Sequence, residues 1–211
     1  MYLSRLILNP RSRQVRSEIG NPYEMHRTIM GAFPEILPED ERVLFRLDTD
    51  RRSGRLTLLV QSLGVPDWSW LAEPGERGYL QPVSDSNPGI KSFQIRLAPG
   101  QRLVFRLRAN PTVKRNGKRL GLLREEDQRN WLNRKATHGG FTVLTADVRT
   151  EGLTKGTIRR PNEKHRLCML AVRFDGILQA TDSERFQETV RQGVGSGKGL
   201  GFGLLSLAPP R

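Results

Sequence analysis

Tyr23 and His26 are the first residues whose side chains suggest chemistry. They lie three positions apart in the segment NPYEMHRTIM, residues 21–30, in a chain with only three Tyr and three His. Residues at this spacing share one face of a helix, so a phenol and an imidazole would lie side by side. Histidine exchanges protons near neutral pH. The pair is therefore a candidate acid–base site, with a purely structural pair as the alternative.

The residues just before the pair predict the start of a helix. Asn21 is suited to capping free backbone N–H groups, and Pro22 suits the first helical position, where no N–H is required. Glu24 follows at the third helical position, as in a capping box. The pattern predicts a helix over 22–33 that ends before Pro34 and carries the Tyr–His pair near its start.

The composition indicates a polyanionic partner. The 211 residues carry a net charge of +13 with a pI of about 10.9, which favours nucleic acid first and an anionic membrane surface second. No stretch approaches the roughly 20 apolar residues that cross a bilayer, so no membrane segment is expected. The single cysteine, Cys168, excludes an intrachain disulfide and favours a cytoplasmic location.

An RNA substrate connects the charge with the Tyr–His pair. RNA can be cut without a metal because its own 2′-OH attacks the adjacent phosphorus, while the protein supplies positioning, proton transfer and charge stabilisation. Helix N-terminal N–H groups and a nearby cation such as Arg27 suit the phosphate. His, Cys, Asp and Glu form no complete set with metal-ligand spacing, so neither a metal nor another cofactor is expected.

A basic cluster occupies residues 102–119, with seven Lys or Arg and no Asp or Glu. Arg106 and Arg108 alternate with apolar residues on a strand, so they share one face. A loop then carries Lys114, Arg115, Lys118 and Arg119. Such a cluster supplies phosphate contacts and counterion release. The alternative is a solvated basic face.

Two further segments are candidates for RNA contacts. Arg159, Arg160 and Lys164 lie in a basic hairpin or loop that suits the end of an RNA stem; the alternative is an exposed basic loop. Every second residue from 193 to 203 is glycine, which matches neither a dinucleotide fingerprint nor a P-loop. This segment would present N–H groups and Lys198 to a phosphate, or form a glycine-bulged strand packed on a helix.

The periodicities predict an α+β fold built from two tandem ferredoxin-like βαββαβ domains, residues 1–90 and 91–211. The first would carry the Tyr–His helix, and the second the basic loops and the glycine-rich tail. The predicted helices are 22–33, 124–140 and a C-terminal helix that ends near 192, after a Thr181–Glu184 capping box. The predicted strands are 2–8, 42–48, 55–62, 92–97, 102–111, 141–150, 204–207 and a pair within 166–182 joined by a turn at Asp175-Gly176.

Four segments together resemble the CasE family, the CRISPR repeat-processing endoribonucleases of type I-E systems. They are MYLSRLILNP, NPYEMHRT, FRLRANPTVKRNGKR and GVGSGKGLGFGLLSLAP. The resemblance covers both ends and the middle of the chain. It implies two ferredoxin-like domains and a role in the Cascade complex with other subunits. In isolation the protein is expected to be a monomer.

The resemblance also implies an activity. The protein would bind the stem-loop of the CRISPR repeat and cut the precursor once at the 3′ base of the stem, without a metal. The products would carry a 2′,3′-cyclic phosphate or 3′-phosphate and a 5′-OH, and the protein would stay bound to the mature crRNA. Tyr23 and His26 match the family's active-site motif, and Arg159 and Arg160 fall at its groove-inserting loop.

Within this resemblance, His26 is expected to be the principal general acid/base and to protonate the 5′-oxygen leaving group. Tyr23 would orient the 2′-OH or the scissile phosphate. Some relatives have a Lys late in the first helix, where this chain has Gly31. A third catalytic contribution would then come from Arg27 or Lys198, or be dispensable.

Two other functions fit parts of the sequence. One is a non-catalytic RNA-binding subunit of a CRISPR ribonucleoprotein, in which Tyr23 and His26 only contact the RNA backbone. The other is a basic ribosome-associated protein, which would show no preference for a repeat hairpin. Product RNA with defined ends separates the enzyme from both.

Overall fold

The computed structural model describes residues 1–71, 78–84, 86–160 and 163–210. Contacts between Cα atoms group the chain into two compact units. Unit 1 comprises Met1–Gln94, Lys155–Leu167 and Gly199–Gly201; unit 2 comprises Ile95–Thr154, Cys168–Lys198 and Phe202–Arg211. The units are therefore interleaved in sequence. The predicted division into domains 1–90 and 91–211 stays a prediction.

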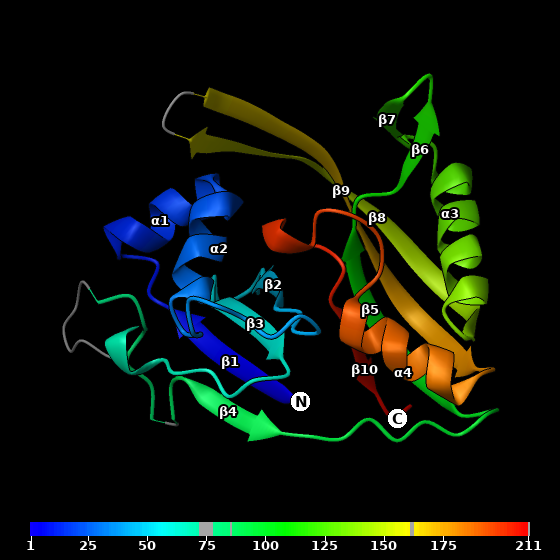
Figure 1. The fold of residues 1–211 in the computed structure, drawn as a ribbon, viewed down its shortest axis with the longest axis horizontal. Helices are drawn as coiled ribbons and strands as arrows, with labels where there is room; N and C mark the ends of the chain where they lie inside the picture. The colour runs from blue at the N-terminus through cyan, green and yellow to red at the C-terminus, as the bar shows by residue number, and fades with distance from the viewer. Residues whose placement is uncertain (72–77, 85, 161–162, 211) are drawn as a thin grey trace. The chain divides into compact units, whose positions relative to one another are not determined.

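Unit 1 contains a four-stranded sheet with the order β2-β3-β1-β4 (Figure 1). Its strands are β1 (Tyr2–Leu8), β2 (Leu44–Thr49), β3 (Leu56–Ser62) and β4 (Gly89–Ser92). Its helices are α1 (Arg13–Gly20), α2 (Pro22–Met30) and the short 3₁₀ helix η1 (Ser69–Leu71). α1 was not predicted, and the predicted strand 92–97 is wrong. The strand in this region is β4, which pairs with β1 and ends where the predicted strand begins.

The core of unit 1 forms between the sheet and the two helices. Val15 of α1, and Met25 and Ile29 of α2, pack with residues of the strands, which include Leu6, Leu8, Phe45, Leu58 and Val60. The buried carboxylate of Glu18 in α1 connects this helix with α2 and with Tyr79 in the segment between η1 and β4. It accepts hydrogen bonds from Gln14 at 2.8 Å, Thr28 at 2.6 Å and the Tyr79 hydroxyl at 2.7 Å. These three donors satisfy a charge that would be costly to bury alone.

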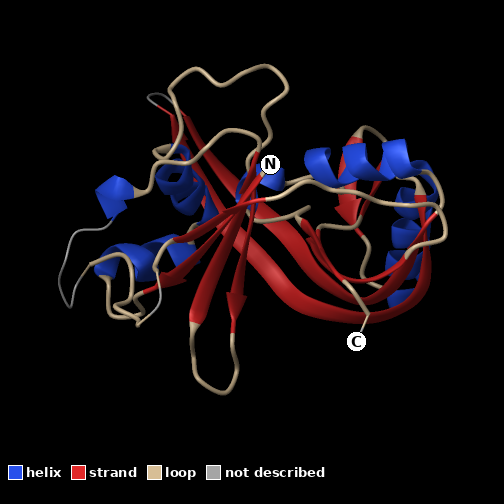
Figure 2. Cartoon of the chain, turned by 90° about the horizontal axis from the view of Figure 1, so that it is seen from below, coloured by secondary structure: helices blue, strands red, loops and turns tan. Residues whose placement is uncertain are grey.

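Unit 2 contains a second four-stranded sheet with the order β10-β5-β9-β8. In Figure 2 its strands curve beneath its two helices. The strands are β5 (Arg102–Ala109), β8 (Phe141–Arg160), β9 (Glu163–Ala180) and β10 (Leu205–Ala208), and the helices are α3 (Glu125–His138) and α4 (Ser183–Gln192). A two-stranded sheet of β6 (Thr112–Arg115) and β7 (Lys118–Gly121) follows β5, and η2 (Lys198–Leu200) precedes β10.

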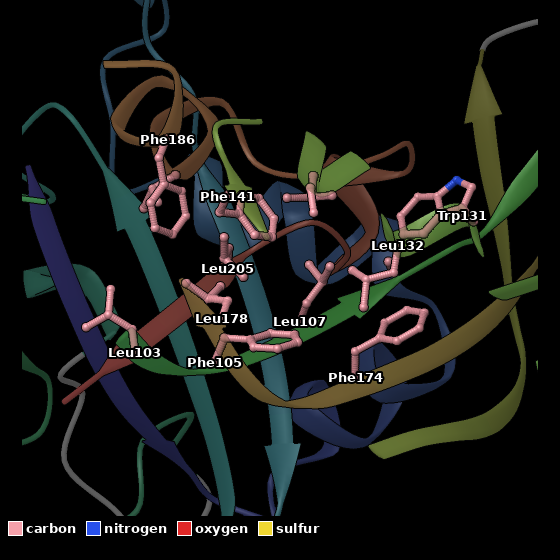
Figure 3. Packing of buried hydrophobic residues seen from close by; sticks show 14 of the residues in the cluster. Leu103, Phe105, Leu107, Trp131, Leu132, Phe141, Phe174, Leu178, Phe186 and Leu205 are labelled. Carbon is pink, nitrogen blue, oxygen red and sulfur yellow. The ribbon is translucent and has the colours of Figure 1, made fainter. Parts of the chain in front are cut away.

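Aromatic side chains fill the core of unit 2 between its sheet and helices (Figure 3). Phe105 and Leu107 come from β5, Phe174 from β9, Trp131 from α3 and Phe186 from α4. The alternating burial along β5 leaves its arginines on the opposite face, as predicted. The α4 cap differs from the prediction, because the Asp182 side chain, rather than a Thr181–Glu184 box, accepts the Arg185 N–H.

The predicted turn at Asp175-Gly176 is wrong, because both residues lie inside the continuous strand β9. Gly176 is required there for packing rather than for turning. A Cβ atom at Gly176 would overlap the carbonyl oxygen of Thr145 in the neighbouring strand β8. Glycine therefore permits close approach of two backbones, which is its other common role in strands.

Together the two units confirm the α+β class, with two antiparallel four-stranded sheets. None of the helices in the described ranges is both long enough and apolar enough to span a bilayer.

Candidate active site

His26 lies on α2 and is packed beside an aromatic ring and a glycine segment. Its imidazole stacks on Phe45 of β2, with ring centroids 6.3 Å apart and planes inclined by 12°. A Cβ atom placed on Gly199 would lie 3.6 Å from Cε1 and Nε2 of the imidazole and 3.7 Å from Cδ2. A point equidistant from three ring atoms lies over the ring, so the Gly199 backbone borders a face of the imidazole.

Gly201 continues this packing along Phe45. A Cβ atom at Gly201 would approach the Phe45 ring to 3.2 Å, and the residue has φ of +80°. Both the tight contact and the left-handed backbone favour glycine. Residues 199–201 therefore hold the rings of Phe45 and His26 in place. Of the alternatives predicted for the glycine tail, packing on a helix agrees with the contact between Gly199 and His26 of α2, whereas the predicted glycine-bulged strand is replaced by η2 (Lys198–Leu200).

Burial sets the charge state of His26. Its Nδ1 atom is buried and has no hydrogen-bond partner among the residues that the structure describes. Burial lowers the pKa of His26 from its ordinary value of 6.5, because a partly desolvated site disfavours the imidazolium. Neutral imidazole is therefore the main form in the free protein at neutral pH.

Tyr23 and Arg27 lie on the same helix as His26. Tyr23 is half-buried and three residues ahead of the histidine, so the predicted i,i+3 pair lies within α2, near its start. The exposed Arg27 guanidinium forms an ion pair with Glu24 at 3.0 Å. An exposed i,i+3 pair of this kind contributes only a few tenths of a kcal/mol, roughly 0.2–0.5, so Arg27 can exchange Glu24 for a phosphate at little cost.

Asn21, at the start of α2, is hydrogen-bonded to Thr157 in strand β8 of the β8–β9 hairpin. Its Oδ1 accepts the Thr157 N–H at 3.0 Å, and its Nδ2 donates to the Thr157 carbonyl at 3.2 Å. A Cβ atom on Gly156 would lie 3.0 Å from Oδ1, so glycine allows this approach. The predicted capping role of Asn21 is wrong, since its side chain makes no cap hydrogen bond. The amide is used for the hairpin instead.

This clamp lies close in sequence to the predicted groove-binding arginines. Arg159 and Arg160 follow Thr157 in β8, and Lys164 lies in β9. Their side chains fall outside the part of the chain that the structure describes. The backbone that leads to Arg159 and Arg160 is nevertheless anchored beside Tyr23 and His26 by Asn21.

The predicted basic face of β5 is partly neutralised by acids from other strands. Arg106 forms an ion pair with Asp175 at 2.5 Å, and Arg108 with Glu151 at 2.8 Å. Arg173 of β9 also contacts both carboxylates, at 3.0 Å and 3.6 Å. The sequence around Arg106 and Arg108 contains no acid, but the sheet brings two acids to them. Arg108 also lies 4.5 Å above the centre of the Phe202 ring.

The other predicted basic residues lie on exposed elements of unit 2. Their loop is in fact the β6–β7 hairpin, which turns at Asn116 and Gly117, both with positive φ. The hairpin exposes its four predicted RNA contacts, Lys114, Arg115, Lys118 and Arg119. Lys198 begins η2, and its Cγ would lie 3.3 Å from a Cβ atom on Gly203. Unlike Arg106 and Arg108, the four hairpin cations form no ion pair with any described residue.

No group of three or more His, Cys, Asp or Glu that could hold a metal occurs within residues 1–71, 78–84, 86–160 and 163–210. The chemistry that the described site offers is therefore that of an imidazole, a phenol and nearby cations. An imidazole that is neutral at rest can take up and return a proton. The phenol can hold a hydroxyl or a phosphate oxygen by hydrogen bonding.

Comparison with known proteins assigns the family. The profile of a family described as "CRISPR associated protein" matches residues 1–209. The CRISPR-associated endoribonuclease Cse3 of Thermus thermophilus is 42% identical over 99% of this chain and 100% of its own. The Cascade subunit CasE of Escherichia coli is 28% identical over the same shares. A structure of Thermus thermophilus Cse3 bound to an RNA that represents a pre-cleavage complex matches with a TM-score of 0.83, at 42% identity, over 99% of this chain and 98% of that one. The chain therefore belongs to the Cse3/CasE family of CRISPR-associated endoribonucleases.

Proposed function

We propose that this protein binds the stem-loop of a CRISPR repeat and cuts the precursor at the 3′ base of the stem without a metal. Attack by the 2′-OH gives a 2′,3′-cyclic phosphate, or a 3′-phosphate after hydrolysis, and a 5′-OH. The protein then remains on the crRNA as a subunit of Cascade. The relatives' names as a CRISPR endoribonuclease and a Cascade subunit support this proposal, and so does the net charge of +13.

The observation that carries the proposal is the setting of His26. A surface histidine of no special role would be free to rotate, whereas this imidazole is stacked on Phe45 and bordered by Gly199. Fixed orientation is what proton transfer in a transition state needs. His26 protonates the 5′-oxygen as it leaves, and Tyr23 orients the 2′-OH or the scissile phosphate.

The RNA contacts follow from the positions of the cations. Arg27, Arg159 and Arg160 serve the scissile region and the stem, because Asn21 anchors their hairpin beside α2. The exposed β6–β7 hairpin supplies phosphate contacts through Lys114, Arg115, Lys118 and Arg119. The remaining proposed RNA contacts are Arg106, Arg108, Lys164 and Lys198. Because Arg106 and Arg108 are ion-paired, their contribution is smaller than that of the hairpin.

We also infer that both units are ferredoxin-like. In unit 2 the element order β5-α3-β8-β9-α4-β10 and the sheet order β10-β5-β9-β8 support this assignment. In unit 1 the sheet order β2-β3-β1-β4 is equivalent, with η1 and its flanking segments in place of the second helix. A ferredoxin-like module has this βαββαβ order.

The test is cleavage of a labelled repeat hairpin in EDTA by wild type and His26→Ala. A matched RNA carries a 2′-deoxy nucleotide at the expected cut. We expect one cut by wild type, none with the deoxy RNA, and a loss of at least about a hundredfold in rate for His26→Ala, with RNA affinity retained. Cleavage that survives in His26→Ala would refute the histidine assignment. Tight binding without any cut by wild type would indicate a non-catalytic RNA-binding subunit instead.

A further inference from the structure

A cleft in unit 1 contains none of the residues assigned to catalysis or RNA binding. It has a volume of about 660 Å³ and is lined by the start of α1 and by η1 with its flanks. Its lining includes Arg11, Ser12, Arg13, Arg16 and Trp70. We propose that this cleft binds an unpaired nucleotide of the RNA that flanks the repeat stem. The proposal rests on the proposed function for the identity of that RNA.

Among the described residues that line the cleft, three are arginines and none is an aspartate or glutamate. Arg11, Arg13 and Arg16 are exposed and form no ion pair with any residue in the described ranges. Several other arginines of the chain are compensated, as in the pairs of Arg106 with Asp175 and Arg129 with Glu125. Three like charges around one concavity repel one another, so an anion bound there relieves the repulsion.

Trp70 adds an aromatic surface to the same cleft. It is 44% exposed, whereas Trp68 and Trp131 are 2% and 4% exposed. Its indole rests against Gly31, where a Cβ atom would lie 3.0 Å from the ring carbon Cζ2. The glycine at position 31 therefore allows the indole to approach the end of α2 closely. An anchored and partly exposed indole is a stacking platform for a nucleobase.

A third feature is the Ser12 hydroxyl. Ser12 is 3% exposed and lines the cleft, and it occupies the N-cap position of α1. A serine there ordinarily accepts a hydrogen bond from the first turn of its helix, but the Ser12 side chain makes none. Its hydroxyl can therefore donate to a phosphate oxygen held by the three arginines.

Position favours RNA over other anionic ligands. The cleft includes Trp70 at the C-terminal end of α2, and the candidate catalytic pair lies near the start of that helix. From Tyr23 to Gly31 the helix rises about 12 Å at 1.5 Å per residue. An RNA strand that leaves the scissile phosphate along α2 reaches the cleft within a few nucleotides. Stacking requires an unpaired base, so the ligand is single-stranded rather than part of the stem.

The experiment measures the affinity of RNA in a His26→Ala background, which prevents cleavage. Three RNAs are compared: a stem-loop alone, and the same stem-loop with an unpaired flank at its 5′ or its 3′ end. The cleft variant carries Arg13→Gln and Arg16→Gln. The matched control carries Arg51→Gln and Arg52→Gln, two exposed arginines in the turn after β2.

We expect one flank to tighten binding about tenfold in the control protein, as stacking of one base does. The cleft variant should lose this gain and keep the affinity of the control for the stem-loop alone. Its slope of log affinity against log salt for the flanked RNA should fall by about one for each phosphate that the substituted arginines no longer bind. Equal flank effects in the two proteins would overturn the proposal.

Fluorescence tests the stacking directly. Trp70 is the exposed tryptophan among the three, so acrylamide quenching reports mainly on it. Flanked RNA should protect it from acrylamide, stem-only RNA should not, and Trp70→Phe should remove the signal. Competition by a short polyglutamate peptide as strong as that by the unpaired RNA would instead indicate a site for an acidic protein segment and overturn the assignment to RNA.

The two proposals fail in different ways. Cleavage by wild type of a hairpin that keeps only the first nucleotide 3′ of the stem, and with it the scissile phosphate, tests the proposed function without involving the cleft. A protein that cuts this hairpin but gains nothing from either flank retains the proposed function and loses the cleft proposal. A protein that cuts nothing, yet gains affinity from a flank through Arg13 and Arg16, loses the proposed activity and keeps the cleft.

Discussion

At the scale of single residues, the setting of His26 determines how its proton chemistry depends on pH. Burial lowers its pKa below 6.5 in the free protein. A bound phosphate acts in the opposite direction, because a nearby negative charge favours the imidazolium. If the scissile phosphate binds beside His26 as proposed, binding of RNA raises the fraction of His26 that carries the proton.

The expected pH profile follows from these two shifts. If His26 protonates the leaving 5′-oxygen, the rate needs the imidazolium form and falls as pH rises through the pKa, approaching tenfold per unit. When the protein is in excess of the RNA but too dilute to saturate it, the cleavage rate should begin to fall below pH 6.5, since the pKa of His26 in the free protein then applies. With saturating protein the fall should begin at higher pH. Single-turnover cleavage at both concentrations, from about pH 5 to 9, measures the two profiles.

The opposite slope would change the assignment. A rate that rises with pH through the lowered pKa of His26 would make the neutral imidazole the active form, and His26 would then accept the 2′-OH proton. Tyr23→Phe serves as the comparison in this series. It removes the hydroxyl but retains the ring. It should therefore lower the cleavage rate without changing the pH at which titration of His26 alters that rate.

At the scale of elements, the site depends on a contact between α2 and a hairpin that is distant in sequence. Asn21 makes two hydrogen bonds with the backbone of Thr157. Each neutral hydrogen bond of this kind contributes about 0.5–1.5 kcal/mol. The contact holds the strand that continues to Arg159 and Arg160. Removal of the contact should therefore lower the rate of RNA cleavage more than the stability of the fold.

Asn21→Ala tests this contact. We expect cleavage of the repeat hairpin to slow about tenfold, the equivalent of about 1.4 kcal/mol, because Thr157 of β8 is no longer held beside the proposed catalytic pair. Hydrogen exchange of the Thr157 amide should accelerate by a similar factor. Asn133→Ala, at an exposed position of α3, is the matched control. Unchanged exchange at Thr157 in Asn21→Ala would contradict the clamp.

At the scale of the whole molecule, the net charge of +13 makes RNA affinity strongly dependent on salt, because bound cations release counterions from the RNA. The positively charged residues are not all equally available to bind RNA phosphates. Arg106 and Arg108 are paired with carboxylates, whereas the cations of the β6–β7 hairpin are exposed. Neutralising each group should therefore give different salt dependences.

We expect Lys118→Gln with Arg119→Gln to reduce the slope of log affinity against log salt by about two, one for each phosphate contact. Arg106→Gln with Arg108→Gln should reduce it by less, since those side chains exchange one anionic partner for another. Titrations of the repeat hairpin between about 50 mM and 200 mM salt give the slopes. An equal reduction, of about two, from the Arg106 and Arg108 substitutions would contradict this expectation and show that their ion pairs break completely on binding.

Much of this protein follows from local signals in the sequence. The alternation of Leu103, Phe105 and Leu107 places these residues in a core and Arg106 with Arg108 opposite, because strand periodicity is a local property. The Tyr23–His26 spacing and Pro22 locate the helix that carries the candidate site. The four CasE-like motifs identify the family. Each of these signals depends either on residues close together in the chain or on a motif that can be matched directly in the sequence.

The tertiary structure decided what depends on contacts between distant segments. Asn21 has a capping side chain by type, yet it bonds to Thr157, which no local pattern could reveal. Asp175-Gly176 is a good turn dipeptide, but its glycine lies in mid-strand because the Thr145 backbone passes too close for a side chain. The acids that pair with the β5 arginines, and the glycine backbone that borders His26, come from residues many positions away. Sequence sets local conformation and chemical type, whereas packing brings together the neighbours that fix each side chain's partner, charge and role.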